Sequence, residues 1–149
     1  MSSSNTMTGA CFCGNVTYDV INVNAETLDG IICHCKSCQR LHTMVSYNVA
    51  LDKDQLRLTK GEPKMYEDFH ADSGKRIVRF FCGDCGSALY SYPDSMPDKV
   101  FAKAGSLDQL ERVIPKVEIF VERVINGTTR EAKARETTLF EGMMAKQLS

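Results

Sequence analysis

The sequence predicts a single all-β domain, and three observations support that prediction. The chain has 149 residues, of which 43% are hydrophobic, and this size and composition suit one domain with its own core. Short runs in which apolar and polar residues alternate recur along it, and this is the period of half-buried antiparallel strands. No helical pattern of convincing length comes before residue 128, so we expect strands to build the fold.

Seven segments carry the strand pattern, and turn-forming residues such as Gly14, Asn24 and Gly61 separate them. In chain order the segments are residues 15–20, 44–51, 55–59, 76–81, 87–92, 99–104 and 117–125. The predicted domain covers residues 7–125 and a tail covers 126–149. The tail is charged, and we expect a short helix or a loose segment there. On such a helix one apolar side would cap the core or form a contact in a homodimer; it consists of Leu139, Phe140, Met143 and Met144.

Charge and hydropathy exclude several classes of partner. The net charge is −1 and the sequence pI is near 6.3, so no basic field favours nucleic acid or an anionic membrane. The first residues, MSSSNTMTGA, lack the cationic and apolar regions of a secretory signal, and the longest apolar runs are too short to span a bilayer. We therefore expect a cytoplasmic protein that acts on a small-molecule substrate. Thiols stay reduced in that compartment, which favours metal ligands over disulfides.

Seven cysteines carry most of the chemical information in the sequence. Pairs spaced C-x-C or C-x-x-C let two sulfurs reach one ion from a single turn, and zinc favours tetrahedral thiolate sites. Glycine after the second cysteine lets backbone amides turn toward the thiolates. The cysteines fall in three groups: Cys11 and Cys13; Cys33, Cys35 and Cys38; Cys82 and Cys85.

Spacing alone leaves the grouping of these cysteines open. The C-x-x-C pairs of the second and third groups could form a zinc ribbon, which leaves three cysteines over. Alternatively, four cysteines close a structural site and three form a second site with an open position for water or substrate. In a further alternative all seven serve two structural ions, with His34 or His42 closing the second.

The segments GACFCGNVTY, CHCKSCQR, RFFCGDCGSALY and AGSLD together resemble the glutathione-dependent formaldehyde-activating enzyme family, which includes centromere protein V. The resemblance covers roughly residues 8 to 122. It implies a compact β-tent of small antiparallel sheets and two zinc ions. The structural ion would be held by Cys11, Cys13, Cys82 and Cys85, and the catalytic ion by Cys33, Cys35 and Cys38.

The activity that this resemblance implies is that of a carbon–sulfur lyase or synthase. A glutathione sulfur would take the open position as thiolate and add to a small aldehyde, or leave from a thiol adduct in the reverse direction. Three thiolates give a divalent zinc site a net charge of about −1. Such an ion is a weaker Lewis acid than one held by three histidines, but it still favours deprotonation of an incoming thiol.

The residues that follow Cys38 supply further candidates. Arg40 matches the family pattern and suits a substrate carboxylate through its bidentate fork. His42 and Thr43 stand where the family usually has small residues. Because His42 lies four positions after Cys38, we predict that it acts as an acid or base at the open position. His34 lies between two ligands, and we predict a structural role for it.

Two other functions stay open on the sequence. The same centre could serve another addition, elimination or decarboxylation of a small molecule, with His42 moving the proton. A non-catalytic zinc module that binds a partner is the other alternative, although no basic run favours a chromatin role. We also expect formaldehyde to be a poor substrate, because its addition to a thiolate needs little of the proton transfer that His42 would supply.

Overall fold

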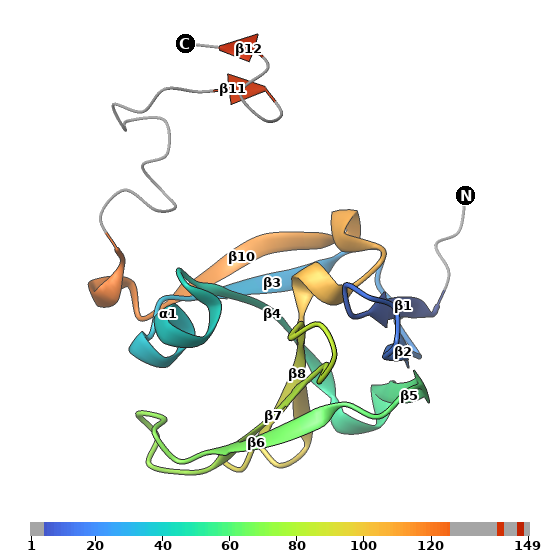
Figure 1. Ribbon diagram of the computed structural model, residues 1–149, viewed down its shortest axis with the longest axis horizontal. Coiled ribbons are helices and arrows are strands. Elements are labelled where there is room, and N and C mark those ends of the chain that lie inside the picture. Colours follow the sequence, from blue (N-terminus) through green and yellow to red (C-terminus); the bar gives the residue numbers. More distant parts are fainter. Residues whose placement is uncertain (1–4, 126–139, 142–145, 148–149) are drawn as a thin grey trace.

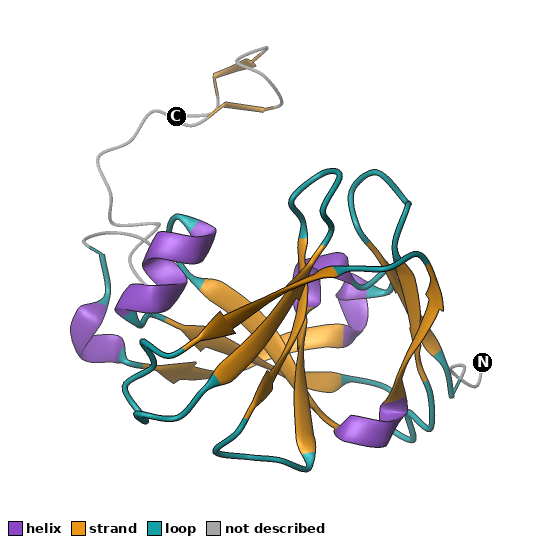
Figure 2. Ribbon diagram, turned by 60° about the horizontal axis from the view of Figure 1, so that its bottom comes forward, coloured by secondary structure: helices purple, strands orange, loops and turns teal. Residues whose placement is uncertain are grey.

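The computed structural model describes residues 5–125, 140–141 and 146–147. Strands are the main secondary structure of this part of the chain, and the helical segments are short, which confirms the all-β prediction (Figure 2). A three-stranded antiparallel sheet has the order β1-β2-β5. Its strands are β1 (Met7–Ala10), β2 (Thr17–Val20) and β5 (Leu56–Lys60).

A second sheet has seven strands in the order β10-β3-β4-β9-β8-β7-β6. All neighbours are antiparallel except β10 and β3, which are parallel. The sheet bends so strongly that β10 and β3 lie across from β6 and β7 (Figure 1). Its strands are β3 (Leu28–Cys33), β4 (Ser46–Asp52), β6 (Lys64–Asp68), β7 (Ile77–Phe81), β8 (Ala88–Pro93), β9 (Lys99–Lys103) and β10 (Val113–Ile119).

One helix, α1 (Lys36–His42), was not predicted. It has seven residues, too few to show a helical period in the sequence. The Cys35 side chain caps it by accepting a hydrogen bond from the Cys38 amide. The remaining helical segments are single 3-10 turns: η1 (Lys53–Gln55), η2 (Ala104–Ser106), η3 (Leu110–Arg112) and η4 (Val121–Arg123).

Six of the seven predicted strands correspond to β2, β4, β5, β7, β8 and β9. The seventh, predicted at residues 117–125, was wrong in its bounds, because β10 ends at Ile119. Phe120 follows with a positive φ of 57°, a conformation that ends the strand and starts η4. The predicted helix of the tail falls mostly outside the described residues. Of its proposed apolar side only Phe140 is described, and it lies in a short strand, β11 (Phe140–Glu141), that pairs with β12 (Lys146–Gln147).

In the two larger sheets three strands, β1, β3 and β6, were not predicted, each for a local reason. Strand β3 contains Asp29-Gly30, a dipeptide that is common in turns. Gly30 is required there because a Cβ atom would lie 2.4 Å from the Tyr47 ring. Strand β6 is a charged edge strand, and Gly9 in β1 leaves room for the ring of Tyr18.

The core lies between the two sheets and takes alternate residues of the larger one. Val49 and Leu51 of β4 are buried in it, together with Ala102 of β9. From the smaller sheet Tyr18 is fully buried and meets Tyr90 edge to face, with the ring centroids 5.8 Å apart. Because successive side chains of a strand point to opposite faces, the residues between these core positions face away from the small sheet.

Candidate metal centres and the adjoining pocket

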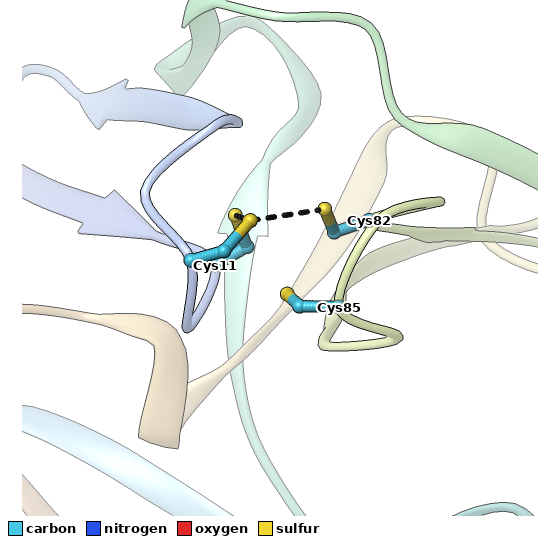
Figure 3. A group of neighbouring side chains, drawn as sticks. Cys11, Cys82 and Cys85 are labelled. Carbon is cyan, nitrogen blue, oxygen red and sulfur yellow. Dashed lines mark hydrogen bonds between the residues drawn. The ribbon is translucent and has the colours of Figure 1, made fainter.

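Four cysteines from two separate turns meet at one point. Cys11 and Cys13 come from the turn between β1 and β2, and Cys82 and Cys85 from the turn between β7 and β8 (Figure 3). The four sulfurs lie within 4.8 Å of one another, with 3.6 Å from Cys11 to Cys13 and 3.8 Å from Cys13 to Cys82. Sulfurs bound tetrahedrally at about 2.3 Å from zinc are themselves about 3.8 Å apart. The cluster therefore fits one zinc ion bound by four protein ligands, with no coordination position left for water or substrate.

The two turns share the same backbone device. Gly14 and Gly86 follow the second cysteine of each pair and have φ angles of 79° and 78°, in the left-handed region that favours glycine. Each glycine amide donates to the carbonyl of the first cysteine of its pair, at 3.1 Å for Cys11 and 2.9 Å for Cys82. These bonds fold each pair into a tight turn with both sulfurs on one side.

The other three cysteines gather where β3 meets α1. Cys33 ends β3, Cys35 caps the helix and Cys38 lies in its first turn; their sulfurs lie within 4.8 Å of one another. Hydrogen bonds from the Cys33 thiol, and from backbone amides in the first turn of α1, lower the pKa of the Cys35 thiol. The structure thus brings together the four and the three cysteines, and not the zinc-ribbon pairing.

A chain of hydrogen bonds leads from a lysine to the three-cysteine cluster. Lys103 Nζ donates to Asn48 Oδ1 at 2.6 Å, and Asn48 Nδ2 donates to Ser46 Oγ at 2.8 Å. Ser46 Oγ lies 3.0 Å from Cys38 Sγ. Since Ser46 accepts from Asn48, its own hydroxyl hydrogen is available to the sulfur. All three links then point the same way, from the Lys103 ammonium toward Cys38 Sγ.

A pocket of about 240 Å³ opens beside the three-cysteine cluster. Its walls are the face of the bent sheet that points away from the core, so Ile31 and Cys33 of β3 lie on it, as do Ser46 and Asn48 of β4. Apolar residues make up much of the remaining wall. Two cations also reach it, Arg79 and Lys103.

These two cations differ in their partners. The Arg79 guanidinium is held by the buried Asp68, with Nε at 2.8 Å and Nη2 at 2.7 Å from Oδ2. Lys103 donates to the neutral amide of Asn48. Burial lowers the pKa of Lys103 to about 8, so at neutral pH it is mostly an ammonium ion. The positive charge of Lys103 is therefore directed at the thiolates rather than at a carboxylate.

Arg40 lies outside this pocket, in a neighbouring hollow of about 660 Å³. Lys36, His70 and Arg123 line the same hollow, and Arg123 forms an ion pair with Asp72 at 2.6 Å. Ser37 and Asp72 line both the hollow and the pocket. The hollow therefore adjoins the pocket at the first turn of α1. Its lining has three Lys and Arg side chains and two carboxylates, those of Asp68 and Asp72.

His42 lines a third hollow, which shares Arg79, Ser91 and Lys103 with the pocket. Within the described residues its Nε2 atom is buried without a hydrogen-bond partner. Burial lowers the pKa of His42 to about 4, and the charges of Lys103 and Arg79 act in the same direction. The imidazole is neutral at pH 7 and lies next to the pocket rather than in its lining.

His34 has the place predicted for it. The ring is buried, and its Nε2 lies 3.0 Å from Glu118 Oε1 of β10. The backbone amide of His34 donates to Ile119 at 3.0 Å. Both contacts fix the segment between Cys33 and Cys35 to the edge strand, away from the thiols.

A family model described as "Glutathione-dependent formaldehyde-activating enzyme" matches residues 6–123. The chain belongs to this family. The fold also resembles a Rhodobacter sphaeroides protein whose crystal structure was solved as a structural genomics target. That protein is 23% identical, the alignment covers 75% of this chain and 98% of that one, and the TM-score is 0.58. No curated protein sequence matches the chain.

The family accounts for a glutathione-related, enzyme-like function and for cysteine clusters that could hold zinc. In the described part of the chain, no helix has the length and apolar character needed to cross a bilayer.

Three residues of the relay, Ser46, Asn48 and Lys103, were not identified from the sequence. The available signal was their alternation with core residues, which places them on one face of β4 and β9.

Proposed function

We propose that the chain is a zinc-dependent enzyme that adds a thiol, glutathione in the first instance, to an aldehyde, and cleaves the carbon–sulfur bond in the reverse direction. The observation that carries this proposal is the contrast between two cysteine clusters. One has four sulfurs in tetrahedral spacing, and the other has three sulfurs on the wall of a pocket. Three protein ligands beside a pocket are the arrangement typical of a catalytic zinc site.

Cys33, Cys35 and Cys38 would hold the catalytic ion, and the other four cysteines the structural ion. When bound, zinc supplies a positive centre that favours the thiolate form of an incoming thiol. Three thiolate ligands weaken that effect, because they leave the site with a net charge of about −1. The relay from Lys103 through Asn48 and Ser46 opposes this by drawing electron density from Cys38.

In the hollow around Arg40, the Arg40 and Lys36 side chains would bind the carboxylates of glutathione. A tripeptide thiol whose sulfur lies at the three-cysteine cluster must extend away from it, and the hollow adjoins the pocket at Ser37. Arg40 and Lys36 lie on α1, within the same helix as Cys38. Both side chains can pair with a carboxylate, and Arg40 can do so through two parallel hydrogen bonds.

His42 stays a candidate acid or base. Its unpartnered Nε2 and its place next to the pocket support the role, whereas a pKa of about 4 makes it a weak base. We expect His42→Ala to lower turnover by roughly 10²–10⁴-fold with zinc content unchanged if it transfers the proton. An unchanged turnover would show that His42 has a packing role only.

A cytoplasmic location is also proposed, since all seven cysteines are free thiols and a reducing compartment keeps them so.

Exchange NMR tests the proposed reaction. Isotope-labelled formaldehyde and glutathione form the S-hydroxymethyl adduct spontaneously, and the rate of label transfer between free and bound aldehyde is measured with and without protein. We expect the zinc-loaded protein to increase this rate and Cys38→Ala to abolish the increase. If neither formaldehyde nor a longer aldehyde such as hexanal exchanges faster with the protein present, the proposed reaction is wrong.

A further inference from the structure

The pocket beside the three-cysteine cluster is larger than formaldehyde requires. Formaldehyde has two heavy atoms, whereas an engineered protein cavity of about 150 Å³ binds benzene. The pocket has a volume of about 240 Å³. It can therefore hold a ring or a short chain in addition to the reacting carbon.

The walls of the pocket are mainly apolar. Ile31 of β3 and Phe101 of β9 project from the same face of the sheet as Cys33 and Lys103. Met96, which is 47% exposed, lies in the turn between β8 and β9 at the edge of the pocket. Side chains of this kind bind a substituent by excluding water from it and do not recognise charge. The remaining apolar side chains of the wall are those of Ala71, Ile77, Pro93, Ile119 and Phe120.

A polar group stands at one end of this apolar surface. Lys103 is joined to Cys38 by the Asn48–Ser46 relay, so its ammonium lies on the cysteine side of the pocket. Arg79 is already paired with Asp68, so it is not available to a substrate carboxylate in the way Arg40 is. Serine and asparagine side chains also line the pocket, but the Lys103 ammonium donates to a neutral amide and stands on the side of the reacting sulfur. A mainly apolar wall with this cation at one end suits a neutral molecule with one polar end.

We propose that the pocket binds an apolar aldehyde of about six or more carbon atoms, with its carbonyl oxygen at Lys103 Nζ and its hydrocarbon part against Ile31 and Phe101. This inference rests on the proposed thiol addition and names the aldehyde that the reaction uses. Formaldehyde fills little of the pocket, and because it has no hydrocarbon part, the apolar walls add nothing to its binding affinity.

The chemical step balances without any further reactant. The thiol loses its proton, its sulfur forms a bond to the carbonyl carbon, and the carbon–oxygen π bond breaks to leave the electron pair on oxygen. The Lys103 ammonium donates a proton to that oxygen and recovers the proton that the thiol released. The product is a hydroxyalkyl thioether, and no group is oxidised or reduced.

Calorimetry with two stable thioethers tests the pocket independently of turnover. S-benzylglutathione mimics an adduct with a six-carbon ring, and S-methylglutathione mimics the formaldehyde adduct. We expect the zinc-loaded protein to bind the benzyl compound at least about tenfold more tightly, because the ring is buried against apolar walls. In exchange NMR, kcat/KM for hexanal should exceed that for formaldehyde by a similar factor.

Variants locate the effect. Ile31→Trp fills the pocket and should bring the two thioether affinities to within about twofold of each other, while the affinity for S-methylglutathione is preserved. Met96→Trp gives the same test at an exposed position, should the first variant fail to fold. Ile114→Trp is the matched control, because Ile114 lies outside the pocket lining and is 37% exposed on β10. It should keep the preference.

The outcomes separate this inference from the proposed function. Equal affinity for the two thioethers, together with kcat/KM for hexanal no higher than for formaldehyde, would overturn the apolar aldehyde and leave the thiol addition standing. Absence of thioether binding, together with no accelerated exchange of any aldehyde, would overturn both. A benzyl preference that survives both Ile31→Trp and Met96→Trp would show that the ring binds elsewhere and would also overturn the inference.

Discussion

The two cysteine clusters differ in how the chain builds them and in what surrounds them. The four-cysteine cluster joins two glycine-containing turns that are about 70 residues apart in the sequence, and it ties the small sheet to the large one. The three-cysteine cluster is local, since Cys33 and Cys38 are five positions apart and both belong to the segment that starts α1. The four-cysteine cluster therefore links the two sheets, whereas the three-cysteine cluster lies on the wall of the pocket.

The surroundings follow the same division. Cys82 is fully buried and belongs to the hydrophobic core, and Cys11 belongs to it as well. Cys33, Cys35 and Cys38 line the pocket and connect to Lys103 through Ser46 and Asn48. The two clusters therefore differ in the number of sulfurs, in sequence separation and in polar neighbours, as expected if the first is the proposed structural site and the second the proposed catalytic site.

The largest expected effect separates the two clusters by stability. Cys82→Ala should unfold the protein or remove its tightly held zinc. Zinc binding at structural cysteine sites contributes about 10–16 kcal/mol, which is comparable to or larger than the whole stability of a typical domain at about 5–15 kcal/mol. Thermal melting and zinc quantitation measure the outcome. Phe12→Ala is the control, because Phe12 lies between two of the ligands but is 95% exposed. Full zinc content with an unchanged Tm would refute the grouping.

The second prediction concerns the pocket cluster. Cys35→Ala should lower total zinc by about one ion per chain and abolish thiol–aldehyde exchange, while a cooperative melting transition persists. The fold survives because β3 and α1 are covalently adjacent and are also held by the contacts of His34. Cys85→Ala provides the comparison. If both variants destabilise the protein equally, two structural ions become the better account.

The third prediction sharpens the electrostatic difference. Lys103→Met should lower kcat/KM for thiol addition by roughly 10²-fold, because the relay loses its charge and the carbonyl oxygen loses its donor. Zinc content and cooperative melting should be retained. Lys99→Met is the matched control on the same strand, where Lys99 pairs with Asp52 on the surface. Equal activity of Lys103→Met and Lys99→Met would show that Lys103 has no part in the reaction.

The smallest expected effect concerns pH. The pKa of His42 is lowered to about 4, whereas an unfolded histidine has a pKa near 6.5, so the unfolded state binds more protons between these values. Stability is therefore lost as the pH falls from about 6.5 toward 4, by about 1–2 kcal/mol at pH 5 after allowance for partial exposure. His42→Phe should be less sensitive than wild type over pH 5–7 in denaturant unfolding. Parallel losses in the two proteins would contradict this assignment.

Much of the strand pattern could be predicted because period-two alternation is visible in residues such as those of β4 and β9. The same alternation, however, does not say whether a polar face meets water or a pocket. Ser46, Asn48 and Lys103 look like ordinary outward positions in the sequence. They become a relay because Asn48 and Lys103 are neighbours on adjacent strands and Cys38 of α1 lies against Ser46.

The cysteine grouping could not be fixed from spacing, because C-x-x-C pairs are compatible with several partners. The resemblance supplied the pairing that the structure shows. It did not supply the position of His42, which depends on where α1 ends. Thr43 has a positive φ of 69° at that end, and His42 faces a hollow whose lining does not include Arg40, although Leu41 lines both hollows.

The central claim is that one zinc site is closed and the other is open, and zinc release to a mild chelator tests it most directly. The protein is first analysed for total zinc and then exposed to a chromogenic chelator, with exchange activity and Tm followed on the same samples. The account predicts two zinc ions per chain, of which one leaves quickly together with the activity while Tm changes little. Release of both ions at one rate, or full activity after the first ion has left, would contradict it.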